Sequence, residues 1–146
     1  MVETAKVNGK DLSISTKKAI EICSFIRGMT IQRAKVVLGE AIKIKQPIPF
    51  KRFTDGAGHR KGKMAGGKYP VKACTEILKL IASVESNAAY KGMNKDKLIL
   101  KHIKADKASQ PLHSGRRRGI VMKRTHVEII VEEGIIEKEK KVDVKK

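Results

Sequence analysis

Aromatic side chains are scarce in this sequence. Tryptophan is absent, and phenylalanine and tyrosine together make up 3% of the 146 residues. A protein that binds single strands by stacking successive bases needs a platform of aromatic rings, so the composition argues against that class. Phe50, Phe53 and Tyr69 lie in one basic segment, and packing of this segment onto the domain is favoured over stacking of its rings on a base.

Cysteines and long apolar runs are also few. Cys23 and Cys74 lie far apart, have no CxxC partner and fall in segments of helical apolar spacing, so we expect reduced core residues rather than a disulfide or a metal site. No apolar run approaches the ~20 residues of a membrane span, and the start of the chain lacks the apolar region of a secretory signal. We therefore expect a cytoplasmic protein without a membrane partner or a metal.

Acidic residues are outnumbered by basic ones. The chain has 33 Lys and Arg against 15 Asp and Glu, a formal net charge of +18. Solubility alone needs a net charge of only about 2 to 8 in a small domain. A field this positive concentrates polyanions around the protein, and nucleic acid is the usual polyanion.

Two segments in the first third of the chain have the apolar spacing of helices. The first is predicted to begin at Ser15 or Thr16 and to run to about Arg27, with Gly28 as the left-handed residue that closes it. The second follows the capping residue Thr30 and ends before the prolines of "QPIPF".

A third helix and a pair of strands are predicted after the basic segment. Pro70 suits the first turn of a helix. Residues 97–105 and 119–133 are rich in β-formers and read as a long antiparallel hairpin, and a short alternation at 11–15 predicts another strand. The apolar stripe of the third helix contains Val71, Cys74, Ile77, Leu78, Ile81, Val84 and Ala88.

These elements predict an α+β fold in which three helices pack on a small antiparallel sheet with a long protruding β-hairpin. We expect a single domain over residues 11–133, which includes a basic loop at 45–68 and the hairpin at about 97–131. Residues 1–10 are expected to form an N-terminal tail and residues 134–146 a charged C-terminal tail.

The candidate RNA-binding residues lie in two basic segments. Loop 45–68 lacks apolar periodicity and has Asp55 as its only acid, and a structureless stretch of this length is uncommon unless it has a function. We expect it to become ordered against a partner. The predicted RNA-binding residues of the loop and hairpin are Lys51, Arg52, Arg60, Lys61, Lys63, Lys68, Lys104, Lys107, Arg116, Arg117, Arg118, Lys123 and Arg124.

The stretch "HSGRRRG" puts three arginines side by side between two glycines. The planar guanidinium group binds two phosphate oxygens at once and is more weakly hydrated than an ammonium group. Hairpin arms of about ten residues extend roughly 30 Å, so the tip lies farther out than the side chains of a small domain can cover. We infer that a polyanion relieves the repulsion among these arginines.

Catalytic patterns are weak. "AGHRKGKM" differs from a phosphate-binding P-loop because it has Ala57 in place of the first glycine and Met64 in place of the magnesium-binding hydroxyl. His59 and His113 lie in basic loops without a carboxylate pair. We predict no catalytic residue, cofactor or small-molecule substrate, although a nucleic-acid-processing enzyme that uses one of these histidines remains an alternative.

Six motifs along residues 11–133 resemble one known family: "ISTKKAIEICSFIRGMT", "PIPFKRF", "GHRKGK", "KYPVKACTEILKLI", "ESNAAYKGMNKDKL" and "RTHVEIIVEE". Their order resembles that of the universal large-subunit ribosomal protein family numbered twenty-two in bacteria and seventeen in eukaryotes. The loop at 45–68 is similar to the archaeal and eukaryotic type.

The resemblance implies a structural, non-enzymatic protein that binds large-subunit rRNA, supports assembly and contacts neighbouring ribosomal proteins. It implies that the globular part lies near the exit of the peptide tunnel, with the hairpin tip in the tunnel wall near the nascent peptide. The family commonly has a basic residue where this chain has Leu112. By position, the tip consists of Gln110, Pro111, Leu112, His113, Ser114, Gly115, Arg116, Arg117, Arg118 and Gly119.

The charge alone leaves a further alternative open. An architectural DNA-binding protein or a general RNA chaperone would have the same positive field. Competition between duplex DNA and large-subunit RNA at matched salt separates these alternatives, because a ribosomal protein is expected to prefer the RNA.

We predict that the hairpin tip and loop 45–68 are mobile in the free protein, because both are long and basic. Amide hydrogen exchange measured without RNA should show fast exchange in these two segments and slow exchange in the helices. Strong protection of both segments would contradict this prediction.

Overall fold

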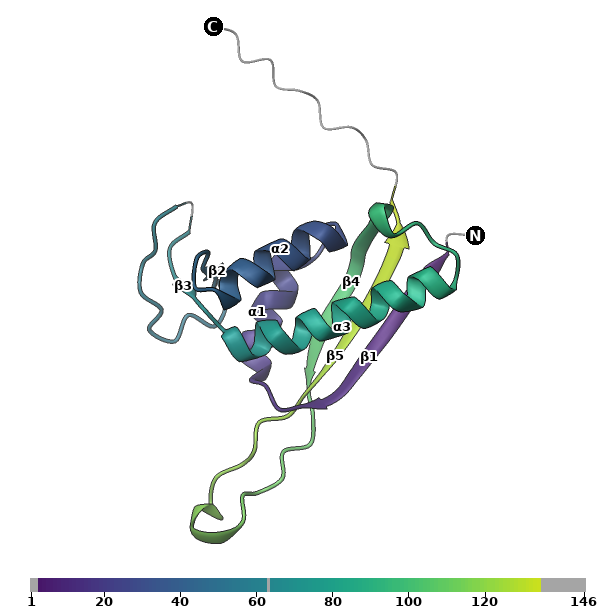
Figure 1. Cartoon of the computed structure of the whole chain (residues 1–146). Helices are drawn as coiled ribbons and strands as arrows, with labels where there is room; N and C mark the ends of the chain where they lie inside the picture. The colour runs from purple at the N-terminus through teal and green to yellow at the C-terminus, as the bar shows by residue number, and fades with distance from the viewer. Residues whose placement is uncertain (1–2, 63, 135–146) are drawn as a thin grey trace, which may run out of the picture.

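Three helices cover one face of a three-stranded antiparallel sheet in the computed structural model, which describes residues 3–62 and 64–134 (Figure 1). The sheet order is β1 (Thr4–Leu12), β5 (Thr125–Glu133) and β4 (Leu98–Lys107), and β5 pairs antiparallel with both neighbours. The predicted α+β class and the β4–β5 hairpin are confirmed.

The central strand β5 is half-buried, as its alternating sequence predicts. Val127, Ile129 and Val131 are fully buried against the helices, whereas Glu128 and Ile130 on the other face are partly exposed. A strand with neighbours on both edges has all its backbone groups available for pairing. In the central position, β5 pairs through its backbone with both β1 and β4.

The helices begin and end close to the predicted residues. They are α1 (Thr16–Ile26), α2 (Ile31–Ile42) and α3 (Val71–Tyr90). α1 packs on β4, α3 packs on β1 and β5, and α2 packs on α3. The local signals explain two boundaries: the Thr30 side chain accepts a hydrogen bond from the Arg33 N–H at 3.4 Å, and Gly28 has the left-handed φ of +79°.

A glycine allows α3 to lie close to β1. A Cβ atom at Gly9 would approach Leu80 Cδ1 to 2.7 Å, which is closer than packed carbons approach one another. The core between the two layers is aliphatic, and its largest fully buried side chains are Ile22, Ile26, Ile31, Leu38, Ile48, Ile77, Ile81, Leu98, Leu100, Ile103, Ile129 and Val84.

The first strand is the element that sequence patterns misplaced. The strand expected at 11–15 is wrong in position, because β1 begins at Thr4, inside the segment expected to be a tail. Only Ala5, Val7 and Gly9 face the helices before Leu12, and alanine and glycine give a weak apolar signal, so β1 is identified by its pairing with β5 and not by its own sequence pattern. Val71, expected in the core stripe of α3, is exposed at the first turn.

The protruding part of the hairpin lies beyond the regular ladder. Residues 108–124, here called the projecting loop, extend from the end of the sheet (Figure 1). Three backbone hydrogen bonds link its arms: Ala108 N–H to Arg124 O, Met122 N–H to Pro111 O and His113 N–H to Ile120 O. A single 3₁₀ turn, η2 (Gly115–Arg117), forms its tip.

Three further short elements complete the described part of the chain. They are β2 (Ile48–Pro49), β3 (Gly67–Lys68) and the 3₁₀ turn η1 (Lys95–Lys97). Among the described helices, none is long and apolar enough to cross a membrane. Residues 135–146 of the expected C-terminal tail lie outside the described residues.

We predict that both thiols are unreactive in the folded protein. Burial raises the pKa of Cys23 and that of Cys74 from 9.0 to about 12, so neither forms the nucleophilic thiolate at pH 8. A disulfide reagent should therefore label them at the rate of unfolding, measured by absorbance with and without denaturant. Because the unfolded thiols ionise first, their contribution to stability should fall as the pH rises from 9 towards 12. Rapid labelling of the native protein at pH 8 would contradict the prediction.

Candidate nucleic-acid interface

The two basic segments meet beside the first turn of α1. A cavity of about 500 Å³ lies between loop 45–68, α1 and the root of the projecting loop. We call it the lysine cleft. Its lining residues come from all three parts of the chain: Ser15, Thr16, Lys17, Lys18, Phe50, Phe53, Asp55, Lys68, Lys107, Gln110 and Lys123.

A buried carboxylate holds loop 45–68 against α1. Glu21 is 4% exposed and accepts hydrogen bonds from the backbone N–H groups of Lys51, Arg52 and Phe53, at 3.1, 2.7 and 2.6 Å. The ends of the loop also pair with each other through β2 and β3. The loop is therefore not structureless along its whole length, because the domain itself anchors residues 48–53. The expected fast amide exchange is accordingly restricted to the remainder of loop 45–68 and to the hairpin tip.

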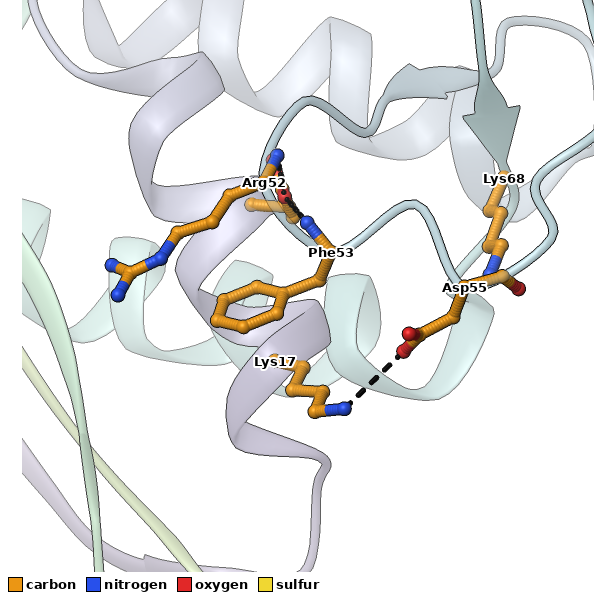
Figure 2. A network of polar contacts seen from close by, with 6 residues as sticks. Lys17, Arg52, Phe53, Asp55 and Lys68 are labelled. Carbon is orange, nitrogen blue, oxygen red and sulfur yellow. Dashed lines mark hydrogen bonds and ion pairs between the residues drawn. The ribbon is translucent and has the colours of Figure 1, made fainter.

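The aromatic residues of the loop pack and also contact cations. Phe50 is 4% exposed, which confirms the packing interpretation for this ring. The Arg52 guanidinium carbon lies 5.1 Å from the centre of the Phe53 ring, and that of Arg60 lies 5.3 Å from the centre of the Tyr69 ring. Figure 2 shows the side chains of Arg52 and Phe53 beside α1. Cation–π contacts of this kind orient the charged groups without neutralising them.

A buried threonine fixes the root of the projecting loop. The Thr125 hydroxyl donates to the backbone oxygen of Ile14 at 3.0 Å and shares a 2.9 Å hydrogen bond with the Thr16 hydroxyl. The first residue of β5 is thereby tied to the first residue of α1. This contact places the two arms of the loop beside the lysine cleft.

The tip arginines are exposed, and none pairs with an acidic side chain of the described residues. Arg116, Arg117 and Arg118 form no ion pair with any carboxylate in residues 3–62 and 64–134. Within the described residues, no carboxylate neutralises their charge. The tip also exposes Leu112 and Ile120, which are 62% and 56% accessible.

Lys104 differs from the other predicted binding residues. Its ammonium group lies 3.0 Å from Asp106 and 3.9 Å from Glu128, on the face of the sheet opposite the helices. The hydrogen bond and the negative charge of Asp106 raise the pKa of Lys104. This lysine is engaged within the sheet, so its charge is less available than those of the loops.

The structure brings some predicted binding residues together and separates others. Lys68, Lys107 and Lys123 converge on the lysine cleft. The arginine triplet lies at the tip, and Lys51, Arg52, Arg60 and Lys61 are exposed on loop 45–68. Arg124 donates to the backbone oxygen of Asp11 at 3.4 Å, and Lys63 lies outside the described residues.

Sequence reasoning did not identify four residues that build this interface: Lys17, Lys18, Glu21 and Thr125. The adjacent lysines carried a signal, because positive charge in the first turn of a helix opposes the helix dipole. Glu21 lies within the apolar stripe of α1, where an ionised side chain needs a polar partner. Nothing in the local pattern distinguishes Thr125 from any other strand threonine.

The candidate catalytic residues are not brought together in the described part of the chain. Within the described residues, no group of three or more His, Cys, Asp or Glu side chains is arranged to hold a metal ion. His59 and His113 lie on two different loops. The arrangement can attract and orient phosphates, which requires donors and positive charge rather than a nucleophile.

The comparisons with known proteins decide the family. A family model described as ribosomal protein L22p/L17e matches residues 7–132, which is most of the chain. The chain belongs to this ribosomal protein family. The family is structural and non-enzymatic, so the histidine-dependent enzyme alternative is set aside.

Three archaeal relatives named "Large ribosomal subunit protein uL22" give the same result. The protein from Methanococcoides burtonii is 46% identical over 68% of this chain and 66% of its own length. Those from Methanococcus aeolicus and Methanocaldococcus jannaschii are 40% and 38% identical over 90% of this chain, and over 90% and 88% of their own lengths. The predicted resemblance is confirmed.

Replacing Glu21 with alanine should release loop 45–68 from α1. The three backbone N–H groups would lose a charged acceptor, at a cost of about 1.5 to 3 kcal/mol in unfolding free energy. Urea denaturation measures this change. The control Glu76→Ala, which breaks only the exposed pair with Lys79, should cost less than about 1 kcal/mol. Equal effects of the two variants would show that Glu21 is not an anchor.

Proposed function

We propose that this chain is a structural protein of the large ribosomal subunit that binds large-subunit rRNA through the projecting loop and loop 45–68. The single observation that carries the proposal is the exposed arginine triplet on a loop that extends beyond the body of the fold, without an acidic partner among the described residues. A phosphate backbone supplies the missing negative charge along such a loop. In the cell the protein is accordingly expected in cytoplasmic ribosomes.

The binding supports assembly because the two basic segments point to different parts of a partner. Loop 45–68 extends from the side of the helical layer, and the projecting loop extends from the end of the sheet (Figure 1). RNA that contacts both is held in a fixed orientation by many phosphate contacts, which carry no sequence information themselves. Neighbouring ribosomal proteins are further partners.

The tip of the projecting loop is proposed to line the nascent-peptide exit tunnel, over residues 110–119. Family membership motivates this part of the proposal. The tip combines exposed apolar side chains, such as Leu112, with the arginine triplet. The arginines suit the RNA wall of a tunnel, and the apolar side chains suit a passing peptide.

Changing Arg116, Arg117 and Arg118 to glutamine should weaken binding to large-subunit rRNA and lower its salt dependence. Each phosphate contact contributes about 0.7 to 0.9 to the slope of log K against log salt, so loss of three contacts lowers the slope by about 2 to 3. Filter binding over a salt series measures both effects. The charge-matched control changes Lys6, Lys95 and Lys97 to glutamine; these three lysines are exposed and lie outside loop 45–68 and the projecting loop.

Three outcomes would contradict the proposed function. The control variant could lose as much slope as the arginine variant, which would mean that net charge alone drives binding. Wild-type protein could bind duplex DNA and large-subunit rRNA equally at matched salt, as expected of an architectural DNA-binding protein or a general RNA chaperone. Crosslinkers placed in residues 110–119 could fail to reach rRNA in isolated large subunits.

A further inference from the structure

The lysine cleft contains one acidic side chain among many basic ones. Asp55 is the single carboxylate in the lining. Because like charges at close range repel one another, the cleft is favourable for anions. The lysines come from α1, β3 and the root of the projecting loop: Lys17, Lys18, Lys68, Lys107 and Lys123.

Asp55 forms a weak, exposed ion pair with Lys17 at the cleft. Its Oδ2 lies 3.4 Å from Lys17 Nζ, and both side chains are about 60% exposed (Figure 2). The second lysine nearby, Lys68, donates to the backbone oxygen of Asp55 at 3.0 Å and not to its carboxylate. An exposed pair of this kind contributes little stability and is readily exchanged for another anion.

The turn that carries Asp55 does not need its charge. Asp55 and Gly56 have φ angles of 39° and 66°, and the Ala57 N–H donates to Thr54 O at 2.8 Å. Two successive left-handed residues closed by such a hydrogen bond form a type I′ turn, in which asparagine serves as well as aspartate. The negative charge is therefore separable from the backbone geometry.

Most lysines of the cleft have no acidic partner among the described residues. Lys18, Lys68, Lys107 and Lys123 form no ion pair with a carboxylate in the described part of the chain. Asp55 pairs with Lys17 alone, whereas a phosphate group that enters the cavity can lie among lysines from all three segments. Charge-assisted hydrogen bonds to several donors are stronger than one exposed pair.

We propose that the lysine cleft is a binding site for an RNA phosphodiester, and that Asp55 occupies it in the free protein and leaves Lys17 when the RNA enters. This inference rests on the proposed function, because it takes RNA as the partner of the two basic segments. Asp55 acts as an internal competitor. A polyanion that does not enter the cleft forms fewer contacts with its lysines and is repelled by the Asp55 carboxylate. Asp55 therefore favours RNA that displaces it over other polyanions, and it lowers the affinity for RNA somewhat because its pair with Lys17 must be broken.

The variant Asp55→Asn tests the inference, because asparagine retains the turn and removes the charge. It should bind large-subunit rRNA about two- to fivefold more tightly than wild type at physiological salt, the size of one exposed charge interaction. Filter binding measures the affinity, and thermal unfolding checks that the fold is intact. Asp55→Gly, which also fits the left-handed turn, should give the same gain.

The matched control is Glu132→Gln. It also removes one negative charge and also breaks an exposed ion pair, between Glu132 and Lys101. Glu132 is seven residues along β5 from Thr125, about 20 Å from the root of the projecting loop. Its rRNA affinity should stay within about twofold of wild type. An equal gain from Glu132→Gln and Asp55→Asn would overturn the inference, because net charge would explain both.

A double-mutant cycle tests the exchange itself. In the wild type, Lys17 gives up its pair with Asp55 when it binds phosphate, whereas in Asp55→Asn it gives up nothing. Lys17→Gln should therefore reduce rRNA affinity by a larger factor in the Asp55→Asn background than in the wild type. Equal factors in the two backgrounds would show that Asp55 and phosphate do not compete for Lys17.

The outcomes separate this inference from the proposed function. If wild-type protein binds large-subunit rRNA with the expected salt slope and Asp55→Asn binds no more tightly, the inference fails and the function stands. If the wild type shows no preference for the rRNA over duplex DNA, the proposed function fails whatever the Asp55 variants do.

Discussion

The hydrogen bonds of the buried Glu21 carboxylate position the basic residues of loop 45–68. The carboxylate accepts hydrogen bonds from three backbone N–H groups of loop 45–68 and thereby holds that loop beside the first turn of α1. A loop with this many lysines and arginines would otherwise move away from a helix that begins with two lysines, because like charges repel. Glu21 opposes this repulsion from the buried side, together with the β2–β3 pairing and the buried side chains of Ile48 and Phe50.

The sheet gives the second basic segment its position. β5 lies between β1 and β4, and Thr125 ties its first residue to the start of α1. The apolar core thus holds the root of the projecting loop while the tip is left to a partner. Stability and binding are separated along one hairpin: the aliphatic residues of β4 and β5 stabilise the domain, and the arginines beyond them carry the charge.

Much of the fold could be predicted from the sequence, because helix signals are local. Thr30 and Gly28 mark helix ends through their own hydrogen bond and dihedral angle, and β5 shows its alternation directly. β1 could not be predicted in its true position, because its pairing with β5 depends on a distant partner. The same holds for the site: the basic segments were evident, whereas their meeting at Lys17 depends on contacts between residues far apart in the sequence.

The β4–β5 ladder restricts the conformational freedom of the projecting loop before any partner binds. The ladder joins the two ends of the loop, so the loop-closure entropy is lost when the protein folds and would not be lost again on binding of the proposed RNA partner. A free basic tail of equal length would lose all of its conformational entropy at the moment of binding. The projecting loop, held at both ends by the ladder, therefore samples a smaller volume than a free basic tail of the same length.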